Sequence, residues 1–169
     1  MVSSPPESLP AQRLRAALAA AEPGLRRISD ADSTVRPRPE KWSHREIIGH
    51  LIDSASNNHQ RFVRAPGMAD LVFSGYDQDG WVELQQYQDV PWNELLDLWV
   101  AFNRQIARVM DAIPEAVRGK VHTRHNLDLV AFRVEQAVPT LEWFMLDYVA
   151  HLEHHLRQVL GASWSADRR

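Results

Sequence analysis

The chain has 169 residues, of which 44% are hydrophobic and 24% are charged, and its net charge is −3. This length is enough for one domain with a full core, and the charge gives no electrostatic argument for nucleic acid or an anionic membrane as a partner. The absence of cysteine excludes disulfides, cysteine-based zinc or iron–sulfur sites and an intrinsic thiol nucleophile, so any transition-metal site must use histidine and carboxylate.

The start of the chain gives no sign of a targeting segment. Residues 1–7 lack the basic and apolar regions of a signal peptide. No later run approaches the ~20 apolar residues of a membrane-spanning helix. We therefore expect a cytoplasmic protein that spans no membrane.

The hydrophobic periodicity is helical along almost the whole chain. A first helix is expected over residues 8–22, where a proline follows, and the prolines and short polar residues of 31–41 indicate a loop. Ser43 and Glu46 have the spacing of a capping box, so a second helix should begin there and run to about residue 65.

The middle of the chain is mixed. Within residues 66–90 we expect a loop over 75–80 and a short helix over 81–87. Pro91 suits the first turn of a third long helix, whose apolar residues form one stripe until Pro114.

The stretch 114–139 fits a loop, a short strand or a helical turn equally well. Thr140 should then cap the last long helix, which runs to about residue 160. The sequence thus predicts an all-α fold, a four-helix bundle with a long connection before the last helix. We interpret residues 1–169 as a single helical domain with flexible ends at 1–7 and 162–169.

The last helix carries the most informative pattern. His151 and His155 are four residues apart and share a helix face, with Cβ atoms roughly 5–6 Å apart. Two imidazoles so placed can converge on one transition metal, whose bonds to nitrogen are about 2.0–2.1 Å long. His154 is three residues from His151 and is the alternative to His155 as the second ligand on this helix. The row of Asp147, His151 and His155 fits an inward face better. The candidate for a third ligand is His50, on the second helix.

Two helices carry a polar ridge beside an apolar face. Bundle proteins build metal sites from such inward side chains on facing helices. Asp53 or Asp147 could orient a ligand by accepting its second ring N–H, or could act as a base. The ridges consist of His50, Asp53, Asn57 and Arg61 on the second helix, and of Asp147, His151 and His155 on the last.

Spacing alone also fits a solvated surface cluster of histidines. His122 and His125 lie in the ambiguous connection and could add a ligand or a substrate contact, although mobile loop histidines are favoured. Arg61 is expected to extend its charged end to the surface rather than to bind anything.

Several blocks agree in order and spacing with a known family and together span roughly residues 18–161. The blocks are Lys41-Trp-Ser43, Glu46-Ile-Ile-Gly-His50-Leu-Ile-Asp53, Tyr76-Asp-Gln-Asp79, Trp81-Val, Gln86-Tyr87 and Asp147-Tyr-Val-Ala-His151-Leu-Glu-His154-His155-Leu-Arg-Gln158. They resemble the DinB-like superfamily, and most of all its branch of YfiT-like metal-dependent hydrolases and bacterial thiol S-transferases.

The resemblance implies a four-helix bundle in up-down-down-up order. It further implies a divalent metal ion, zinc or nickel, held by His50, His151 and His155, and it favours a homodimer. The stretch 114–139 follows the family pattern least clearly, so the wall that faces the substrate is the least defined part.

A three-histidine metal with open positions can activate water for hydrolysis. It can also bind a thiol cosubstrate as thiolate and transfer it. We therefore expect a metal-dependent enzyme, either a hydrolase or a low-molecular-weight-thiol S-transferase, that acts on a small electrophilic substrate and not on nucleic acid or membrane. The alternative is a non-catalytic metal-binding or stress-response protein, helical and dimeric.

Overall fold

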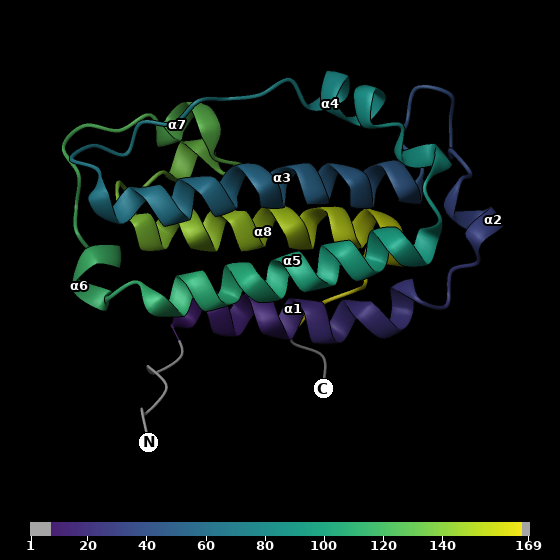
Figure 1. Ribbon diagram of the computed structural model, residues 1–169, viewed down its shortest axis with the longest axis horizontal. Helices are drawn as coiled ribbons and strands as arrows, with labels where there is room; N and C mark the ends of the chain where they lie inside the picture. The colour runs from purple at the N-terminus through teal and green to yellow at the C-terminus, as the bar shows by residue number, and fades with distance from the viewer. Residues whose placement is uncertain (1–7, 167–169) are drawn as a thin grey trace.

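Four long helices form a bundle in the computed structural model, which describes residues 8–166 (Figure 1). They are α1 (Leu9–Leu25), α3 (His44–Arg64), α5 (Trp92–Ala112) and α8 (Leu141–Leu160). Helices α1 and α8 run in one direction and α3 and α5 in the other (Figure 1). The expected all-α bundle in up-down-down-up order is confirmed.

Because α3 and α5 are parallel, the chain must return along the whole bundle between them (Figure 1). A helix of about 20 residues is about 30 Å long, so this return needs a long connection. The sequence predicted one long connection before α8, whereas the structure has a second one between α3 and α5. Its elements are η1 (Ala65–Gly67), α4 (Gln78–Gln85) and η2 (Tyr87–Asp89).

The connection before α8 stays near one end of the bundle (Figure 1). It contains three short helical elements and, between Leu71 and His125, an isolated bridge to the segment that follows α3. Its helical elements are α6 (Glu115–Arg118), α7 (Leu127–Val130) and η3 (Val134–Gln136).

The predicted helix starts agree with the structure where a side-chain cap defines them. Ser43 and Glu46 form the capping box of α3, and Thr140 accepts the Trp143 amide at the start of α8. Such caps satisfy amides that have no partner inside the helix.

Three boundaries differ from the prediction. Helix α1 continues through Pro23 to Leu25, because the Leu25 side chain is fully buried in the core. Ser29 caps the short helix α2 (Asp30–Ser33) inside the expected loop. Helix α4 begins three residues earlier than expected, since Asp77 accepts the Gly80 amide.

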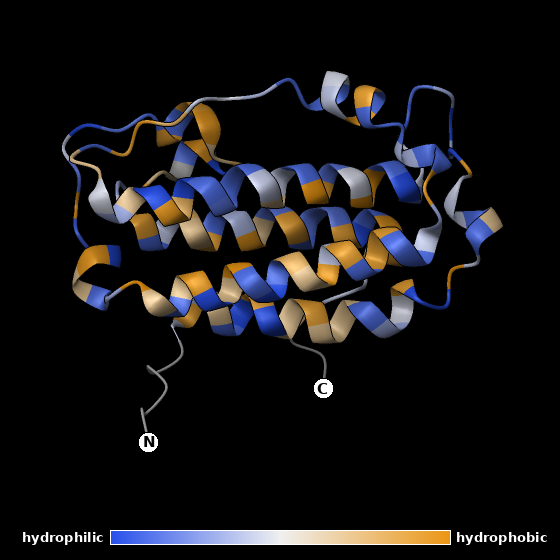
Figure 2. Cartoon of the chain, viewed as in Figure 1, coloured by the Kyte–Doolittle hydropathy of each residue, from blue (hydrophilic) through white to orange (hydrophobic). Residues whose placement is uncertain are grey.

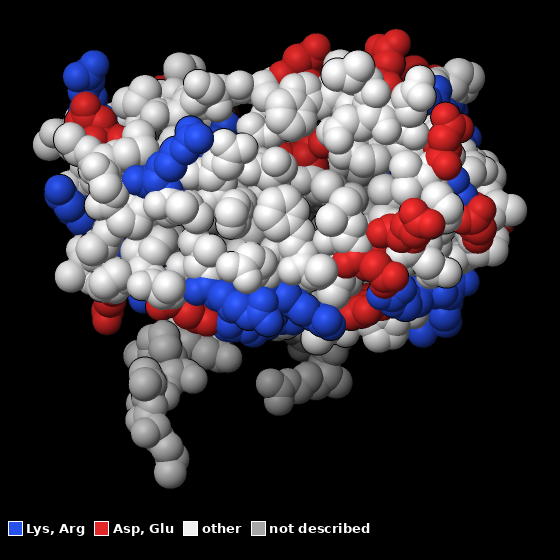
Figure 3. All heavy atoms as spheres, viewed as in Figure 1, with Lys and Arg blue, Asp and Glu red and all other residues white. Residues whose placement is uncertain are grey.

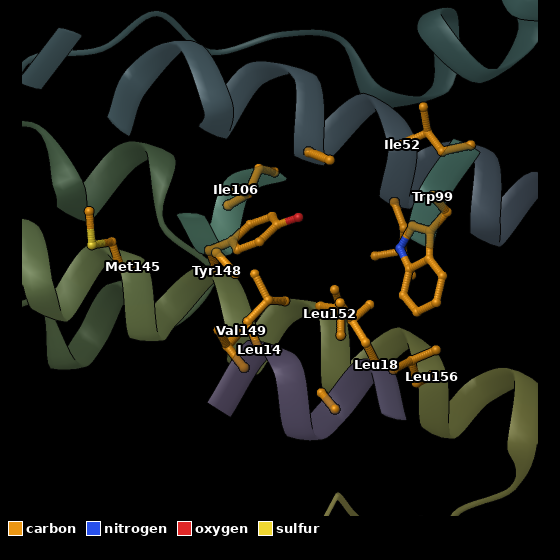
Figure 4. Close-up of a cluster of buried hydrophobic side chains, with 14 of the residues drawn as sticks. Leu14, Leu18, Ile52, Trp99, Ile106, Met145, Tyr148, Val149, Leu152 and Leu156 are labelled. Atoms are coloured by element: carbon orange, nitrogen blue, oxygen red, sulfur yellow. The ribbon is translucent and has the colours of Figure 1, made fainter. Parts of the chain in front are cut away.

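The core lies where the apolar faces of the helices meet (Figure 2). In Figure 4, side chains from α1, α3, α5 and α8 point into one cluster, among them the fully buried Leu14, Trp99 and Leu152. The buried Tyr148 hydroxyl donates to Asn103 Oδ1 at 2.6 Å, so this polar pair is satisfied inside the core.

On the face shown in Figure 3, basic and acidic side chains are interspersed, and basic side chains follow the lower edge along α1 and α5. Part of this edge is an ion-pair network in which Glu22 contacts Arg26 and Arg104. Among residues 8–166, no helix is both long and apolar enough to cross a membrane.

The ends expected to be flexible lie mostly outside the described residues, which exclude 1–7 and 167–169. Of the remaining tail, the half-buried Trp164 packs against the core, and its amide donates to the Gly161 carbonyl at 2.9 Å.

Candidate metal centre

Three histidines from two helices come together at the centre of the site. His50 lies on α3, and His151 and His155 lie one turn apart on α8. The Nε2 atom of His151 is 3.2 Å from Nε2 of His50 and 3.1 Å from Nε2 of His155. Among the described residues, this is the one group of three histidine or carboxylate side chains close enough to share an ion.

Hydrogen bonds outside the cluster orient the two α8 rings. Gln158 Oε1 lies 2.9 Å from His155 Nδ1, and Gln158 Nε2 lies 3.2 Å from His154 Nε2. Because an amide oxygen only accepts, His155 carries its proton on Nδ1 and keeps the Nε2 lone pair free. The Nδ1 of His151 lies 3.4 Å from the Ser54 hydroxyl.

Burial keeps these imidazoles neutral. Burial, with a smaller contribution from His155, lowers the pKa of His50 to about 3. Burial also holds the pKa of His151 well below its ordinary value, and the neighbouring histidines add to this effect. The pKa of His155 is lowered mainly by burial. Neutral imidazole is the form that binds a metal.

The spacing of His151 Nε2 to each of the other two nitrogens fits one transition ion. Two nitrogens bound at 2.0–2.1 Å are about 3.0 Å apart at a right angle and about 3.4 Å apart at the tetrahedral angle. The two separations around His151, 3.2 and 3.1 Å, lie between these limits. Three neutral imidazoles are a donor set suited to zinc, copper, iron or nickel.

Asp53 does not orient a histidine, contrary to the expectation from its place on the ridge. Its Oδ1 accepts hydrogen bonds from the Tyr87 hydroxyl at 2.7 Å and from the Gln85 amide. Burial raises the pKa of this carboxyl although both donors oppose the shift. Asp53 therefore braces the α4–η2 segment against α3.

Asp147 also has partners other than the histidines. Its carboxylate accepts from the Phe132 amide at 2.7 Å, from the Arg133 amide at 2.9 Å and from Arg133 Nε at 3.0 Å. These bonds hold the Phe132 ring against His151 and His154, with ring centroids 5.5 and 5.1 Å apart. The role of Asp147 is to fix this segment over the site, not to hold a ligand ring.

The remaining candidate histidines lie outside the cluster. His154 is exposed and belongs to the Gln158 hydrogen bonds instead. We expected His122 to be a mobile loop residue, but its side chain is buried. Its Nδ1 lies 3.0 Å from the Ala69 carbonyl oxygen. His125 is half-buried, and its Nδ1 accepts the Leu127 amide at 3.4 Å.

Two cavities meet at His155. The first, of about 310 Å³, reaches His151 and His155 and lies between Phe132 and the α3 residues Asn58 and Arg61. The second is a wider groove of about 810 Å³, lined by residues that include Trp42, His44 and Gln158. Of the three histidines, His155 lines both cavities, whereas His151 lines only the first.

Four residues of the site were not among those predicted from the sequence. Ser54 and Gln158 follow ligand candidates at spacings of four and three, and this helical spacing could have identified them. Trp42 packs on His50, with ring centroids 4.9 Å apart, and Phe132 covers His151. No local signal predicts these two contacts, because both residues lie outside the long helices.

Comparison with known proteins gives two findings. The family model of the DinB superfamily matches residues 12–159. YfiT from Bacillus subtilis, described as a probable metal-dependent hydrolase with an unusual four-helix bundle topology, is similar in structure with a TM-score of 0.69 and 22% identity over 96% of this chain and 95% of that one. At this identity the likeness concerns the fold alone. No curated protein sequence matches the chain.

Proposed function

Since the chain belongs to the DinB superfamily, we propose that it is a metal-dependent hydrolase that acts on a small molecule. The observation that carries the proposal is the cluster of His50, His151 and His155, whose Nε2 atoms converge beside a cavity of about 310 Å³. The description of YfiT as a probable metal-dependent hydrolase supports the same reaction class.

In this proposal the three histidines hold one divalent ion, with zinc and nickel as the predicted metals. Such an ion supplies Lewis-acid activation of water and of a substrate carbonyl at neutral pH. Three protein ligands leave coordination positions open, as in catalytic rather than closed structural sites.

The residues around the cluster have defined tasks in this mechanism. Gln158 holds the His155 ring so that its Nε2 lies 3.1 Å from His151 Nε2, where these residues would hold the ion, and Ser54 faces the Nδ1 atom of His151. Phe132, held in place by Asp147, covers one side of the cluster and restricts the entry of water. Both carboxylate oxygens of Asp147 accept hydrogen bonds from the Phe132–Arg133 segment, whereas only Oδ1 of Asp53 accepts hydrogen bonds, from Gln85 and Tyr87. Of the two carboxylates, Asp53 therefore keeps the oxygen that could accept a proton.

Transfer of a low-molecular-weight thiol is the second candidate, because two cavities meet at His155. A transferase must admit a thiol and an electrophile together, whereas a hydrolase needs room for one substrate and water. The wider groove of about 810 Å³ beside Trp42 is large enough for a second organic molecule.

Metal content is the first test. The protein, purified without a histidine tag, should contain about one zinc or nickel ion per chain by elemental analysis. His50→Ala and His151→Ala should each remove most of it, while the matched control His154→Ala should retain it. If both cluster variants keep full occupancy, the assigned site is wrong.

The reaction class is tested on the metal-loaded protein. It is incubated with a panel of esters and amides, and separately with biological thiols and an electrophile panel. Cleavage that is lost in His151→Ala supports the hydrolase. Thiol consumption without cleavage supports the transferase. Full metal occupancy with neither reaction favours the non-catalytic alternative, for which sedimentation tests the predicted homodimer.

A further inference from the structure

Arg61 is a buried cation without a carboxylate partner among residues 8–166. Its side chain lies at the end of α3 and is 8% exposed, which contradicts the expectation that it extends to the surface. Its guanidinium donates two hydrogen bonds, from Nη1 to Asn58 Oδ1 at 3.3 Å and from Nη2 to the Ser74 carbonyl at 2.5 Å. Since a guanidinium has five N–H donors, these bonds leave three for another partner.

The other buried arginines of the described chain each have an acidic partner. Arg45 pairs with Asp30, and Arg118 pairs with Glu142. Arg61 has no acidic partner among residues 8–166, and beside its hydrogen bonds it packs against the rings of Phe73 and Phe144, with centroids 5.9 and 5.8 Å from its Cζ atom. A buried charge left without a counter-charge is costly, and arginine cannot relieve the cost by losing its proton. An anion in the adjoining cavity would supply the missing counter-charge.

Arg61 lines the same cavity as the histidine cluster. Ser54, Asn58 and Arg61 follow one another along α3 and form one wall, and His151 and His155 form part of the other. The acidic side chain in the lining, Asp147, already pairs with Arg133. A molecule in this cavity therefore meets an unpaired cation on one side and the proposed metal on the other.

We propose that Arg61 is the anion-binding residue of the substrate pocket and that the substrate carries a carboxylate. The planar guanidinium matches a carboxylate in two parallel hydrogen bonds, and one cation balances one negative charge. A phosphate group, with a charge of about −1.5 to −2, would leave part of its charge unbalanced here. The claim that Arg61 binds the substrate rests on the proposed function. The claim that Arg61 binds a free carboxylate is independent of it.

The test uses the full-length protein with propionate as the anion and propionamide as its neutral counterpart. Titrations are followed by NMR at the Arg61 Nε–H resonance, in metal-free and in zinc-loaded protein. Propionate should shift this resonance in both forms and propionamide in neither. Arg61→Met, which keeps an unbranched apolar side chain, should weaken propionate binding by about tenfold or more. Arg64→Met, at an exposed position on the same helix, is the matched control and should leave binding unchanged.

Four results would overturn the proposal. They are no shift of the Arg61 resonance, equal binding of propionate and propionamide, equal affinity in Arg61→Met and wild type, and tighter binding of inorganic phosphate than of propionate. Propionate binding that needs zinc and ignores Arg61→Met would place the anion on the metal instead. A poorly folded Arg61→Met variant does not spoil the test, because the resonance shift is read in the wild type.

Failure of this inference can be told apart from failure of the hydrolase. Protein that binds propionate at Arg61 but cleaves no ester refutes only the hydrolase. Protein that cleaves neutral esters but shows no Arg61 shift refutes only the carboxylate site. If both proposals hold, Arg61→Met should raise KM more for a carboxylate-bearing ester than for its neutral methyl ester, and the control Arg64→Met should change neither.

Discussion

Gly49→Ala should destabilise the protein although it places a better helix former inside a helix. Gly49 lies in the middle of α3, beside His50, and the ring of Tyr87 packs directly on it. A methyl group there would overlap with Cδ2, Cγ and Cε2 of that ring, closer than real Cβ contacts come. The ring must move, and its hydroxyl then leaves the Asp53 carboxylate.

The expected loss is about 1.5–5 kcal/mol in the free energy of unfolding. Overpacking costs about 1–3 kcal/mol, and the lost hydrogen bond to a carboxylate adds about 1.5–3 kcal/mol. The gain in helix propensity returns about 1 kcal/mol. Urea unfolding followed by circular dichroism measures the difference, with the slope checked for an unchanged two-state transition.

Two controls separate the overlap from a general effect of alanine. The one close contact of an added methyl in Gly24→Ala is with Cδ2 of the flexible Leu160 side chain, 2.9 Å away, so its effect should stay within about 1 kcal/mol. In a Tyr87→Ala background the overlap is gone, and Gly49→Ala should become neutral or stabilising. A Gly49→Ala protein at least as stable as the wild type would refute the packing argument.

Three further changes test the residues around the cluster. Burial raises the pKa of Asp53, so the folded protein binds this proton more tightly than the unfolded chain. The wild type therefore loses stability as the carboxyl ionises, and Asp53→Asn does not. The stability of Asp53→Asn relative to the wild type, measured by urea unfolding, should increase from pH 4 to pH 7. Asp147→Asn should lower the free energy of unfolding by about 2 kcal/mol and speed hydrogen exchange at the Phe132 amide, because a buried acceptor is weakened. Gln158→Leu should weaken zinc binding about tenfold in competition with a chelator, because the His155 ring loses the acceptor that orients it.

Each of these changes has an outcome that contradicts its reasoning. A constant stability difference between pH 4 and pH 7 would mean that the Asp53 carboxyl titrates alike in the folded and unfolded chain. If hydrogen exchange at the Phe132 amide is unchanged in Asp147→Asn, the Asp147 carboxylate does not hold the Phe132 segment in place. Unchanged zinc affinity in Gln158→Leu, with loss in the exposed control Arg157→Leu, would show that general helix stability controls binding and not ring orientation.

The sequence determined what depends on neighbours along the chain. Ser43 and Glu46 define the start of α3 because a capping box is built within four residues, and Thr140 defines the start of α8 in the same way. His151 and His155 share a face because helix geometry fixes a spacing of four. The polar ridge of the second helix made His50 a candidate for the third ligand, and the resemblance between blocks supported it, although no local rule connects it to α8.

Only the tertiary structure decided the partners of the charged side chains. Asp53 and Asp147 have the right spacing to support a ligand ring, yet segments far away in the sequence supply their hydrogen bonds. Arg61 has the long flexible side chain of a surface residue, but the 74–76 segment and Phe144 enclose it. The physical reason is that periodicity shows which face of a helix turns inward but not which groups lie opposite. A buried charge is satisfied or left unpaired by residues that the fold alone brings to it.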